Sequence, residues 1–281
     1  MSTLQALFIA ILQGATELFP ISSLGHAVIV PSLLGWSIDQ RAPEFLPFLV
    51  LLHTGTAVAL ISYFWRDWWA LLLGVLGQGG EVRVAEARRM TLLIIVATIP
   101  AVILGAGLAS FFRTLFATPL VACGFLVLNG VVLLIGERLR GRAAQSGTKP
   151  LSHLTMLDAL VIGIFQCGAL LPGISRAGAT MVGGLLRGLN HQSSAHFSFL
   201  IATPIIVGAT VHEVPQLLRA SVPAGVLQQA AIAAVLAGIT AWLSTAFLMR
   251  YFRNHDNWAL NPFAFYCLVF GAGSAALLLL K

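Results

Sequence analysis

The sequence predicts an all-α integral membrane protein, and three observations support this fold class. Hydrophobic residues make up 58% of the 281 positions and charged residues only 9%, whereas a soluble domain usually carries about 25% charged residues. The mean hydropathy is +0.91. Apolar runs near the length of about 20 residues that a membrane-crossing helix needs follow one another along the chain. We therefore expect a single membrane domain over residues 1–281.

Six apolar runs are long enough to cross a membrane. The predicted spans are residues 46–65, 92–110, 120–136, 197–212, 224–249 and 258–280. Two further apolar stretches, 4–34 and 156–190, are interrupted near their middles by Pro20 and by the pair Pro172 and Gly173. Each arm has about 12 to 15 residues, which at about 1.5 Å per residue reaches roughly the bilayer midplane. We therefore predict two re-entrant helix hairpins beside the six transmembrane helices.

The distribution of basic residues predicts the orientation, because cytoplasmic loops are enriched in Lys and Arg. If the run 46–65 enters the cytoplasm, the inner loops carry eleven cations and the outer loops carry four. The outer four are Arg41, Arg113, Arg219 and Lys281. Trp65, Trp68 and Trp69 then lie at the inner interface, where aromatic side chains are enriched. The opposite orientation would reverse the bias, so we reject it.

The same orientation places the two hairpins on opposite sides of the membrane. The first starts and ends outside, the second starts and ends inside, and their tips are expected to meet. Such a pair is typical of an inverted-topology repeat whose interrupted segments form the binding site. The segment 13–25 aligns without gaps on 166–178 with five identical residues in thirteen. We therefore predict a first repeat over residues 1–153 and a second over 154–281.

The composition also argues against two other kinds of site. The net charge of +6 does not indicate a nucleic-acid partner, because the Arg and Lys residues are spread over short loops and form no single basic face. Cys123, Cys167 and Cys267 are odd in number and far apart, so they predict neither a disulfide framework nor a metal site.

The N-terminal apolar run has no basic region before it, so we expect no cleaved signal peptide.

Two charged residues, Glu17 and Arg176, lie deep inside predicted membrane segments, one in each hairpin. An ionisable side chain in that position is costly unless it is paired or hydrated, which favours a functional role. The structural alternative is an ion pair that only locks the two hairpins together. Gln13 lies one helical turn before Glu17 and therefore on the same helix face.

Hydroxyl and imidazole groups follow the Pro20 break. Ser22, Ser23 and His26 lie close to the Glu17 carboxylate in the sequence. Together these groups predict catalysis by nucleophilic attack and proton transfer at the first tip.

The second tip, residues 172–180, offers the groups that bind a phosphate. Gly173 permits close backbone approach, and Ser175 and Thr180 supply hydroxyls. Arg176 supplies a guanidinium fork beside free N–H groups at a helix start. The sequence therefore predicts an anionic phosphate group as the ligand.

Some of these residues also fit structural roles. Ser22 and Ser175 each precede a returning half-helix, and we expect at least one of them to act only as an N-cap. His53 interrupts the first full span and Glu213 ends the fourth. For both, a role around the site and a structural role stay open.

The motifs at both tips resemble those of a known family. Residues 13–26 fit Glu/Gln-x-x-x-Glu followed by Pro-x-Ser-Ser-x-Gly-His, and residues 172–180 are similar to Pro-Gly-x-Ser-Arg-Ser-Gly-Ala-Thr. Residues 197–204 and 262–266 also look like segments of this family. At these residues the sequence resembles the undecaprenyl-pyrophosphate phosphatase family, the bacitracin-resistance type of membrane phosphatase.

The resemblance implies six spanning helices and two re-entrant pairs in the bacterial inner membrane, with the site open to the periplasm. It implies removal of the terminal phosphate from undecaprenyl pyrophosphate, which recycles the carrier lipid of peptidoglycan synthesis and confers bacitracin resistance. It also implies a divalent cation, Mg²⁺ or Ca²⁺. The sequence departs from the family at Gln13, where Glu is the other option, at Leu24, where Thr is frequent, and at Ala177, where Ser is expected.

Our hypothesis assigns each residue a role. Glu17 and Gln13 position the cation, and Ser23 or His26 attacks the terminal phosphorus, a choice that the sequence leaves open. The residues expected to bind the pyrophosphate are Arg176, Gly173, Ser175, Thr180 and Ser22.

Two other functions compete with this hypothesis. An anionic-lipid transporter or flippase is the main alternative, because inverted repeats with broken helices are also a transporter architecture. A non-catalytic assembly subunit would leave the charges of Glu17 and Arg176 in the membrane without a use. The sequence also leaves open whether the chain forms a homo-oligomer.

Overall fold

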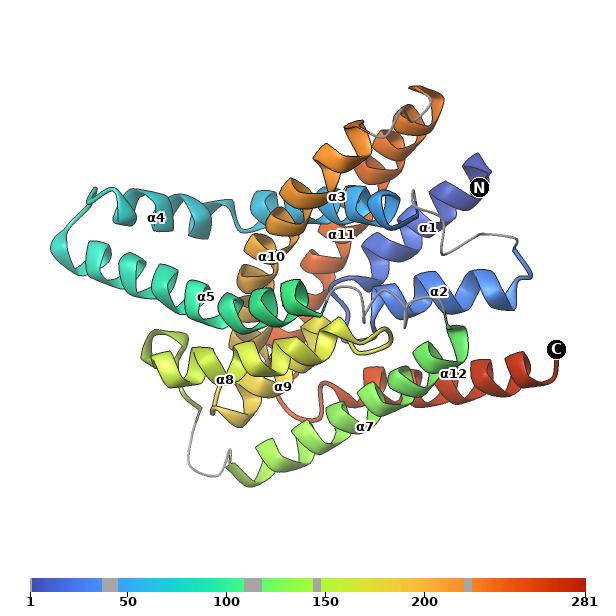
Figure 1. The fold of residues 1–281 in the computed structure, drawn as a ribbon. Helices are drawn as coiled ribbons and strands as arrows, with labels where there is room; N and C mark the ends of the chain where they lie inside the picture. The colour runs from blue at the N-terminus through green and yellow to red at the C-terminus, as the bar shows by residue number, and fades with distance from the viewer. Residues whose placement is uncertain (1, 37–44, 109–117, 144–147, 220–223) are drawn as a thin grey trace.

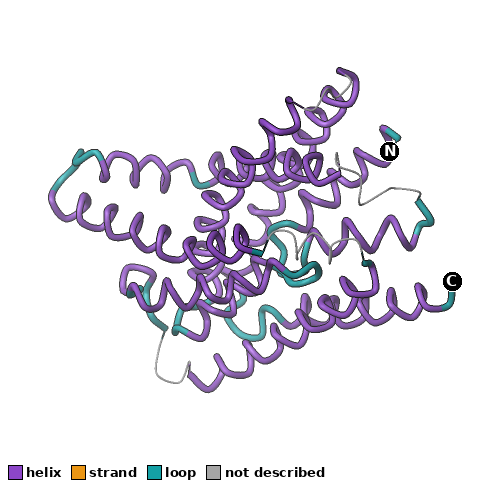
Figure 2. Tube along the Cα trace, viewed as in Figure 1, coloured by secondary structure: helices purple, strands orange, loops and turns teal. Residues whose placement is uncertain are grey.

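The computed structural model describes residues 2–36, 45–108, 118–143, 148–219 and 224–281, and every regular element within these ranges is helical. Two of the predicted outer cations, Arg41 and Arg113, lie outside the described residues. Figures 1 and 2 show long helices joined by short loops. The helices are α1 (Thr3–Thr16), α2 (Ser23–Leu33), α3 (Phe45–Tyr63), α4 (Trp65–Val75), α5 (Glu81–Gly107), α7 (Pro119–Ala143), α8 (Met156–Cys167), α9 (Arg176–Leu186), α10 (His191–Arg219), α11 (Ala224–Asn254) and α12 (Asn261–Leu279), with 3₁₀ turns at Leu151–His153 and Gly168–Leu170.

The prediction of an all-α membrane protein is confirmed. Five described helices, α5, α7, α10, α11 and α12, are long and apolar enough to cross a membrane. The pair α3 and α4, bent by 77°, makes a sixth span if it is counted as one. Apolar side chains on the outer faces of these helices are exposed, for example Ile103, Val235 and Val269. In water such faces would be unfavourable, whereas lipid solvates them.

Two helical segments were not predicted. The amphipathic helix α4 has only 11 residues, below the length of a span, and α5 begins at Glu81, eleven residues before the apolar run at 92–110. The added turns of α5 carry Glu and Arg side chains, which are good helix formers in contact with water. The length of the apolar run therefore does not reveal them. α4 and the first half of α5 lie side by side, as Figure 1 shows at the left.

Both predicted hairpins are present, and their tips meet. α1 and α2 form the first, and α8 and α9 form the second. In Figure 1 the first pair extends to the right from the centre and the second pair to the left. At the contact the Ser175 hydroxyl donates to the Phe19 carbonyl over 3.1 Å. The division into repeats 1–153 and 154–281 stays a prediction.

Glycines allow this close approach of the two tips. Gly173 has a φ of +108°, and a Cβ there would lie 2.3 Å from the Ala122 carbonyl oxygen on α7. A Cβ on Gly25 would lie 3.0 Å from the Gly173 Cα. Only glycine combines this positive φ with backbone contact on two sides. The Gly173 position is thus explained by packing.

Asn129 on α7 joins the two tips from the side. Its Nδ2 donates to the Pro20 carbonyl over 2.9 Å, and its Oδ1 accepts from the Ser175 backbone N–H over 3.0 Å. The side chain is fully buried. One amide therefore satisfies a free carbonyl in the first turn and a free N–H in the second.

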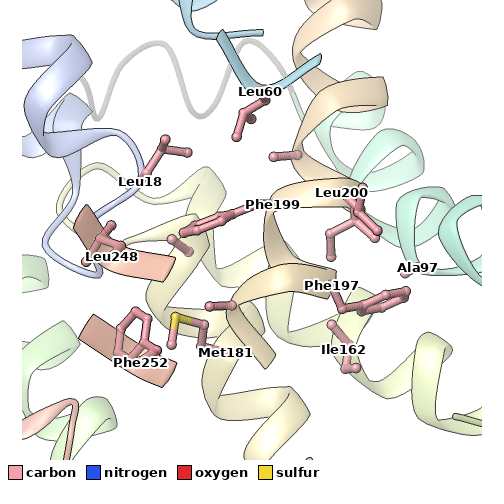
Figure 3. Packing of buried hydrophobic residues seen from close by; sticks show 14 of the residues in the cluster. Leu18, Leu60, Ala97, Ile162, Met181, Phe197, Phe199, Leu200, Leu248 and Phe252 are labelled. Atoms are coloured by element: carbon pink, nitrogen blue, oxygen red, sulfur yellow. The ribbon is translucent and has the colours of Figure 1, made fainter. Parts of the chain in front are cut away.

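The packing interlocks the first and second halves of the chain. α1 and α3 pack chiefly on α11, and α7 packs chiefly on α12. Figure 3 shows the largest buried cluster, where Leu18 of the first tip, Leu60 of α3 and Met181 of α9 surround the aromatic rings of α10. Van der Waals contact of this kind, rather than exclusion of water, holds helices together in lipid.

Ion pairs hold the polar ends of several helices. Asp158 at the start of α8 accepts from Lys149 and, over 2.5 Å, from Arg187 at the end of α9. At the turn after α11, Asp256 accepts from His191 and Arg140. These contacts fix the ends of the second hairpin and of α10 to their neighbours.

Candidate active site

Glu17 lies at the point where α1 ends and the first turn begins. It is the C-cap of α1, and its N–H donates to the Gln13 carbonyl over 2.9 Å. The residue is only 8% exposed. Because the helix stops here, the carboxylate projects beyond the helix end toward the second hairpin.

Four side chains from four helices surround the Glu17 carboxylate. Its Oε1 accepts from Arg176 Nη2 of α9 over 2.9 Å. Its Oε2 accepts from Gln13 Nε2 over 2.9 Å and from Ser23 Oγ over 2.5 Å. The His53 Nε2 of α3 lies 3.2 Å from the same oxygen. The structure thus brings together Gln13, Glu17, Ser23 and Arg176, as the sequence predicts, and adds His53.

Two buried polar atoms of this cluster have no hydrogen-bond partner among the described residues. They are Arg176 Nη1 and Gln13 Oε1. Buried polar atoms are nearly always paired in folded proteins, so an unpaired donor and an unpaired acceptor in one cluster are candidate contacts for a ligand. Arg176 Nη1 could donate to an anion, and Gln13 Oε1 could bind a cation.

The residues present fit a divalent cation in chemical type. A carboxylate and an amide oxygen are ligands that Mg²⁺ and Ca²⁺ prefer, and substrate phosphate commonly completes such a site. Among the described residues, no group of three or more His, Cys, Asp and Glu side chains is arranged to hold a metal. Any cation at Glu17 would therefore need ligands of other types as well.

Ser22 and Ser175 both act as N-caps. Ser22 Oγ accepts from Gly25 N over 3.2 Å, and Ser175 Oγ accepts from Gly178 N over 3.1 Å. That at least one of these serines acts only as an N-cap stays a prediction, since Ser175 Oγ also donates to the Phe19 carbonyl. Ser22 also has a φ of +67°, an uncommon conformation for a residue with a Cβ, which is found most often at functional sites.

His26 lies in the same hairpin, and both of its ring nitrogens contact residues other than Glu17. Its Nδ1 donates to the Ser22 carbonyl over 2.7 Å, and its Nε2 lies 2.7 Å from the Tyr266 hydroxyl of α12. Because a carbonyl can only accept, the neutral ring carries its proton on Nδ1 and accepts from Tyr266 at Nε2. The ring also stacks on Phe270. His26 therefore braces the turn that presents Ser23.

The Thr180 hydroxyl also contacts groups other than the Glu17 carboxylate. Its hydroxyl lies 2.7 Å from the Arg176 carbonyl and 2.6 Å from the Ser198 hydroxyl on α10. This contact joins the second hairpin to α10. The predicted phosphate-binding residues Ser175, Thr180 and Gly173 thus form the framework around Arg176, and their roles toward a ligand stay predictions.

Three residues at the site were missed or left without a role: His53, Asn129 and Tyr266. His53 gave a signal, since it is an ionisable residue in an apolar run. Nothing in the sequence distinguishes Asn129 and Tyr266 from ordinary buried polar residues, because their partners are far away in the sequence. The side chain of Glu213 lies outside the described residues.

Comparison with known proteins identifies the relatives of the chain. The family described as Bacitracin resistance protein BacA matches residues 6–273. An undecaprenyl-diphosphatase of Granulibacter bethesdensis is 60% identical over 285 aligned positions, covering 98% of this chain and 97% of the relative. One from Acidiphilium cryptum is 58% identical with 99% of both chains covered. One from Mycolicibacterium paratuberculosis is 41% identical, covering 100% of this chain and 99% of the relative.

Proposed function

The chain belongs to the bacitracin resistance protein BacA family, and we propose that it acts as an undecaprenyl-diphosphatase at the Glu17 cluster. It removes the terminal phosphate of undecaprenyl pyrophosphate and returns undecaprenyl phosphate, the carrier lipid of peptidoglycan synthesis. The observation that carries the assignment to this site is the contact of Glu17 with both Ser23 and Arg176 inside a multi-pass membrane protein.

Arg176 is the residue that binds the pyrophosphate. One guanidinium nitrogen, Nη2, is held by Glu17, and the buried Nη1 has no partner. A guanidinium held at one nitrogen keeps a fixed direction, and its other N–H groups suit phosphate oxygens. The surrounding apolar helices would accommodate the lipid chain.

Ser23 is the better placed of the two candidate nucleophiles. Its Oγ donates directly to Glu17 Oε2 over 2.5 Å, so a base is already in contact with the attacking group. Arg176 orients that base from the other oxygen. Both ring nitrogens of His26 are occupied by Ser22 and Tyr266. We therefore assign attack to Ser23 and positioning of the turn to His26.

The reaction then follows in two displacements. Ser23 Oγ attacks the terminal phosphorus while its proton passes to Glu17, and the bond from that phosphorus to the bridging oxygen breaks. Undecaprenyl phosphate leaves with the bridging oxygen and takes the proton from Glu17. Water, giving a proton to Glu17, attacks the phosphoserine, the Ser23 Oγ–phosphorus bond breaks, and inorganic phosphate departs as Ser23 regains a proton.

A divalent cation completes the proposal. Glu17 and the unpartnered oxygen of Gln13 would hold Mg²⁺ or Ca²⁺. When bound, such a cation neutralises negative charge on the pyrophosphate oxygens.

The location in the cell follows from the charge bias of the loops. We propose a bacterial inner membrane with the site open to the periplasm, because eleven cations lie in the predicted inner loops and four in the outer loops. The partner is the lipid itself, and the scattered basic residues give no reason to expect a nucleic acid. A homo-oligomer stays an open question that light scattering in detergent would answer.

The test is phosphate release from undecaprenyl pyrophosphate by purified protein in detergent, with Mg²⁺ or Ca²⁺ added. A substrate radiolabelled at the terminal phosphorus should label the native chain and His26→Gln on rapid quenching, and Ser23→Ala should stay unlabelled. Label on His26 would contradict the assignment of Ser23. A folded native chain that releases no phosphate, yet moves labelled lipid across proteoliposomes, would favour the transporter alternative.

A further inference from the structure

Potential metal ligands converge on one edge of the Glu17 carboxylate. Ser23 Oγ and His53 Nε2 lie within 3.2 Å of Glu17 Oε2. The Gln13 amide donates to the same oxygen through Nε2, and its Oε1 has no partner among the described residues. We propose that His53 Nε2 is a protein ligand of a divalent cation at Glu17 Oε2 and Gln13, so that the site binds Mn²⁺ more tightly than Ca²⁺. This inference rests on the cation role given to Glu17 in the proposed function.

The hydrogen bond on the far side of the ring prepares His53 for this role. Its Nδ1 lies 2.7 Å from the Leu49 carbonyl, which can only accept, so Nδ1 carries a proton. In the neutral ring, Nε2 therefore points a lone pair at the Glu17 oxygen. Histidines that bind metals commonly donate their second ring nitrogen to a carbonyl in this way, which fixes both tautomer and ring direction.

Two lone pairs facing each other need a positive charge between or beside them. A proton on His53 Nε2 would supply one, but it would leave the buried Gln13 Oε1 without a partner. A cation can satisfy both groups. Gln13 is 1% exposed, and a half-turn of its amide would place Oε1 against the Glu17 edge in place of Nε2. The unpartnered oxygen therefore favours a cation over a proton.

The spacing also suits a shared metal ion. Two ligands bound at about 2.1 Å to one ion and set at roughly 90° to 110° are about 3.0 to 3.4 Å apart. The distance between His53 Nε2 and Glu17 Oε2 is 3.2 Å. Arg176 contacts the other carboxylate oxygen, Oε1, so its ion pair need not break when Oε2 binds the cation.

His53 also offers the route by which an ion enters. Its side chain is 24% exposed, whereas the side chains of Glu17 and Arg176 are 7% and 12% exposed. A usable metal site needs such an entry path. An imidazole ligand changes the preference of the site, because Ca²⁺ takes oxygen ligands, whereas Mn²⁺, although the weakest binder of the first-row transition ions, accepts imidazole beside oxygen ligands.

The experiment is electron spin-echo envelope modulation of Mn²⁺ bound to the full chain in detergent, without lipid substrate. Coordination by an imidazole gives a nitrogen modulation that oxygen ligands do not give. The native chain should show it, and His53→Gln and His53→Asp should lose it. His255→Gln is the matched control, since His255 is an exposed histidine whose ring Nδ1 bonds to the Tyr251 carbonyl, and it should keep the modulation.

Titration of free Mn²⁺ by its continuous-wave signal gives the affinity. His53→Gln should raise the dissociation constant for Mn²⁺ at least about tenfold, as loss of a metal-supporting group does, and should change that for Ca²⁺ less. Absence of nitrogen modulation in the native chain, its persistence in His53→Gln, or tighter binding of Ca²⁺ than Mn²⁺ would each overturn the proposal.

A native spectrum without nitrogen modulation overturns the proposal whether or not the His53 variants fold. The readout is also independent of catalysis. A native chain that shows the His53 signal but releases no phosphate would overturn the proposed function and leave the cation site standing. A native chain that releases phosphate but shows no nitrogen modulation would overturn the cation site and leave the proposed function standing.

Discussion

Arg176 Nη2 and Glu17 Oε1 are 2.9 Å apart, although 159 positions separate the two residues in the chain. Each lies at the tip of a different hairpin, and both side chains are largely buried. The ion pair therefore joins the two tips and orients the carboxylate that contacts Ser23. Removing one partner of a buried pair usually costs about 3 to 5 kcal/mol, because the other charge is left unpaired.

Arg176→Lys should separate binding of the phosphate from stability. Lysine keeps the positive charge beside Glu17 but cannot offer a second fixed nitrogen to the substrate. We expect phosphate release to fall at least about 100-fold, which corresponds to roughly 2.7 kcal/mol of transition-state stabilisation. The unfolding midpoint should change little. Arg187→Lys, which alters the ion pair with Asp158 at the other end of α9, is the control and should retain most activity.

Gly173→Ala should be more destabilising than Gly188→Ala. Both glycines have positive φ values, +108° and +90°, so each alanine carries a backbone penalty of about 1 to 2 kcal/mol. A Cβ at Gly173 would also lie 2.3 Å from the Ala122 oxygen, whereas at Gly188 the nearest atom is 3.6 Å away. Equal losses in the free energy of unfolding would contradict the contact between the second tip and α7.

Asn129→Ala should loosen the contact between the tips. The change leaves the Pro20 carbonyl and the Ser175 N–H without partners, and each unpaired buried group costs about 1 to 3 kcal/mol. We expect a lower unfolding midpoint together with reduced phosphate release. Pro20 lies between Glu17 and Ser23 in the chain, and Ser175 directly precedes Arg176. Asn190→Ala removes one N-cap bond to Ser193 at the start of α10. It should cost only about 1 kcal/mol and leave activity near the native level.

Asp256 should make stability depend on pH at the polar end of α10. Burial raises the pKa of Asp256, but hydrogen bonds from His191 and the charge of Arg140 outweigh it, so the net pKa is lowered. A lowered pKa in the folded state gives stability that is present above the unfolded value of about 3.9 and is lost as pH falls through the folded pKa. The unfolding midpoint of Asp256→Asn should lie below that of the native chain at pH 7, and the two should converge in acid. A constant difference at all pH values would contradict this contact.

The hairpins could be predicted because their signals are local. Pro20 and the Pro172–Gly173 pair break apolar runs that are otherwise continuous, and the charges of Glu17 and Arg176 are costly in lipid unless they meet. The inner face of α3 could not be predicted in the same way. His53 is recognisable in that helix as an ionisable residue in an apolar run, but the sequence does not reveal what it contacts; the packing of α3 on α10 and α11 places it 3.2 Å from Glu17.

The orientation of the His26 side chain could not be predicted from the sequence either. Its partner Tyr266 lies 240 positions away, and the choice between facing Ser23 and facing α12 depends on the rotation of α2. α4 was missed for a different reason, because an 11-residue amphipathic helix is too short to be recognised as a span.

The interlocking of the two halves has a consequence for biogenesis. α1, α3 and α7 find their chief neighbours in α11 and α12, which the ribosome makes last. Until Arg176 is synthesised, a nascent chain holds the carboxylate of Glu17 in or near the bilayer without its countercharge. The Glu17 cluster is therefore incomplete until Arg176 has been made, and α11, on which α1 packs, follows later still.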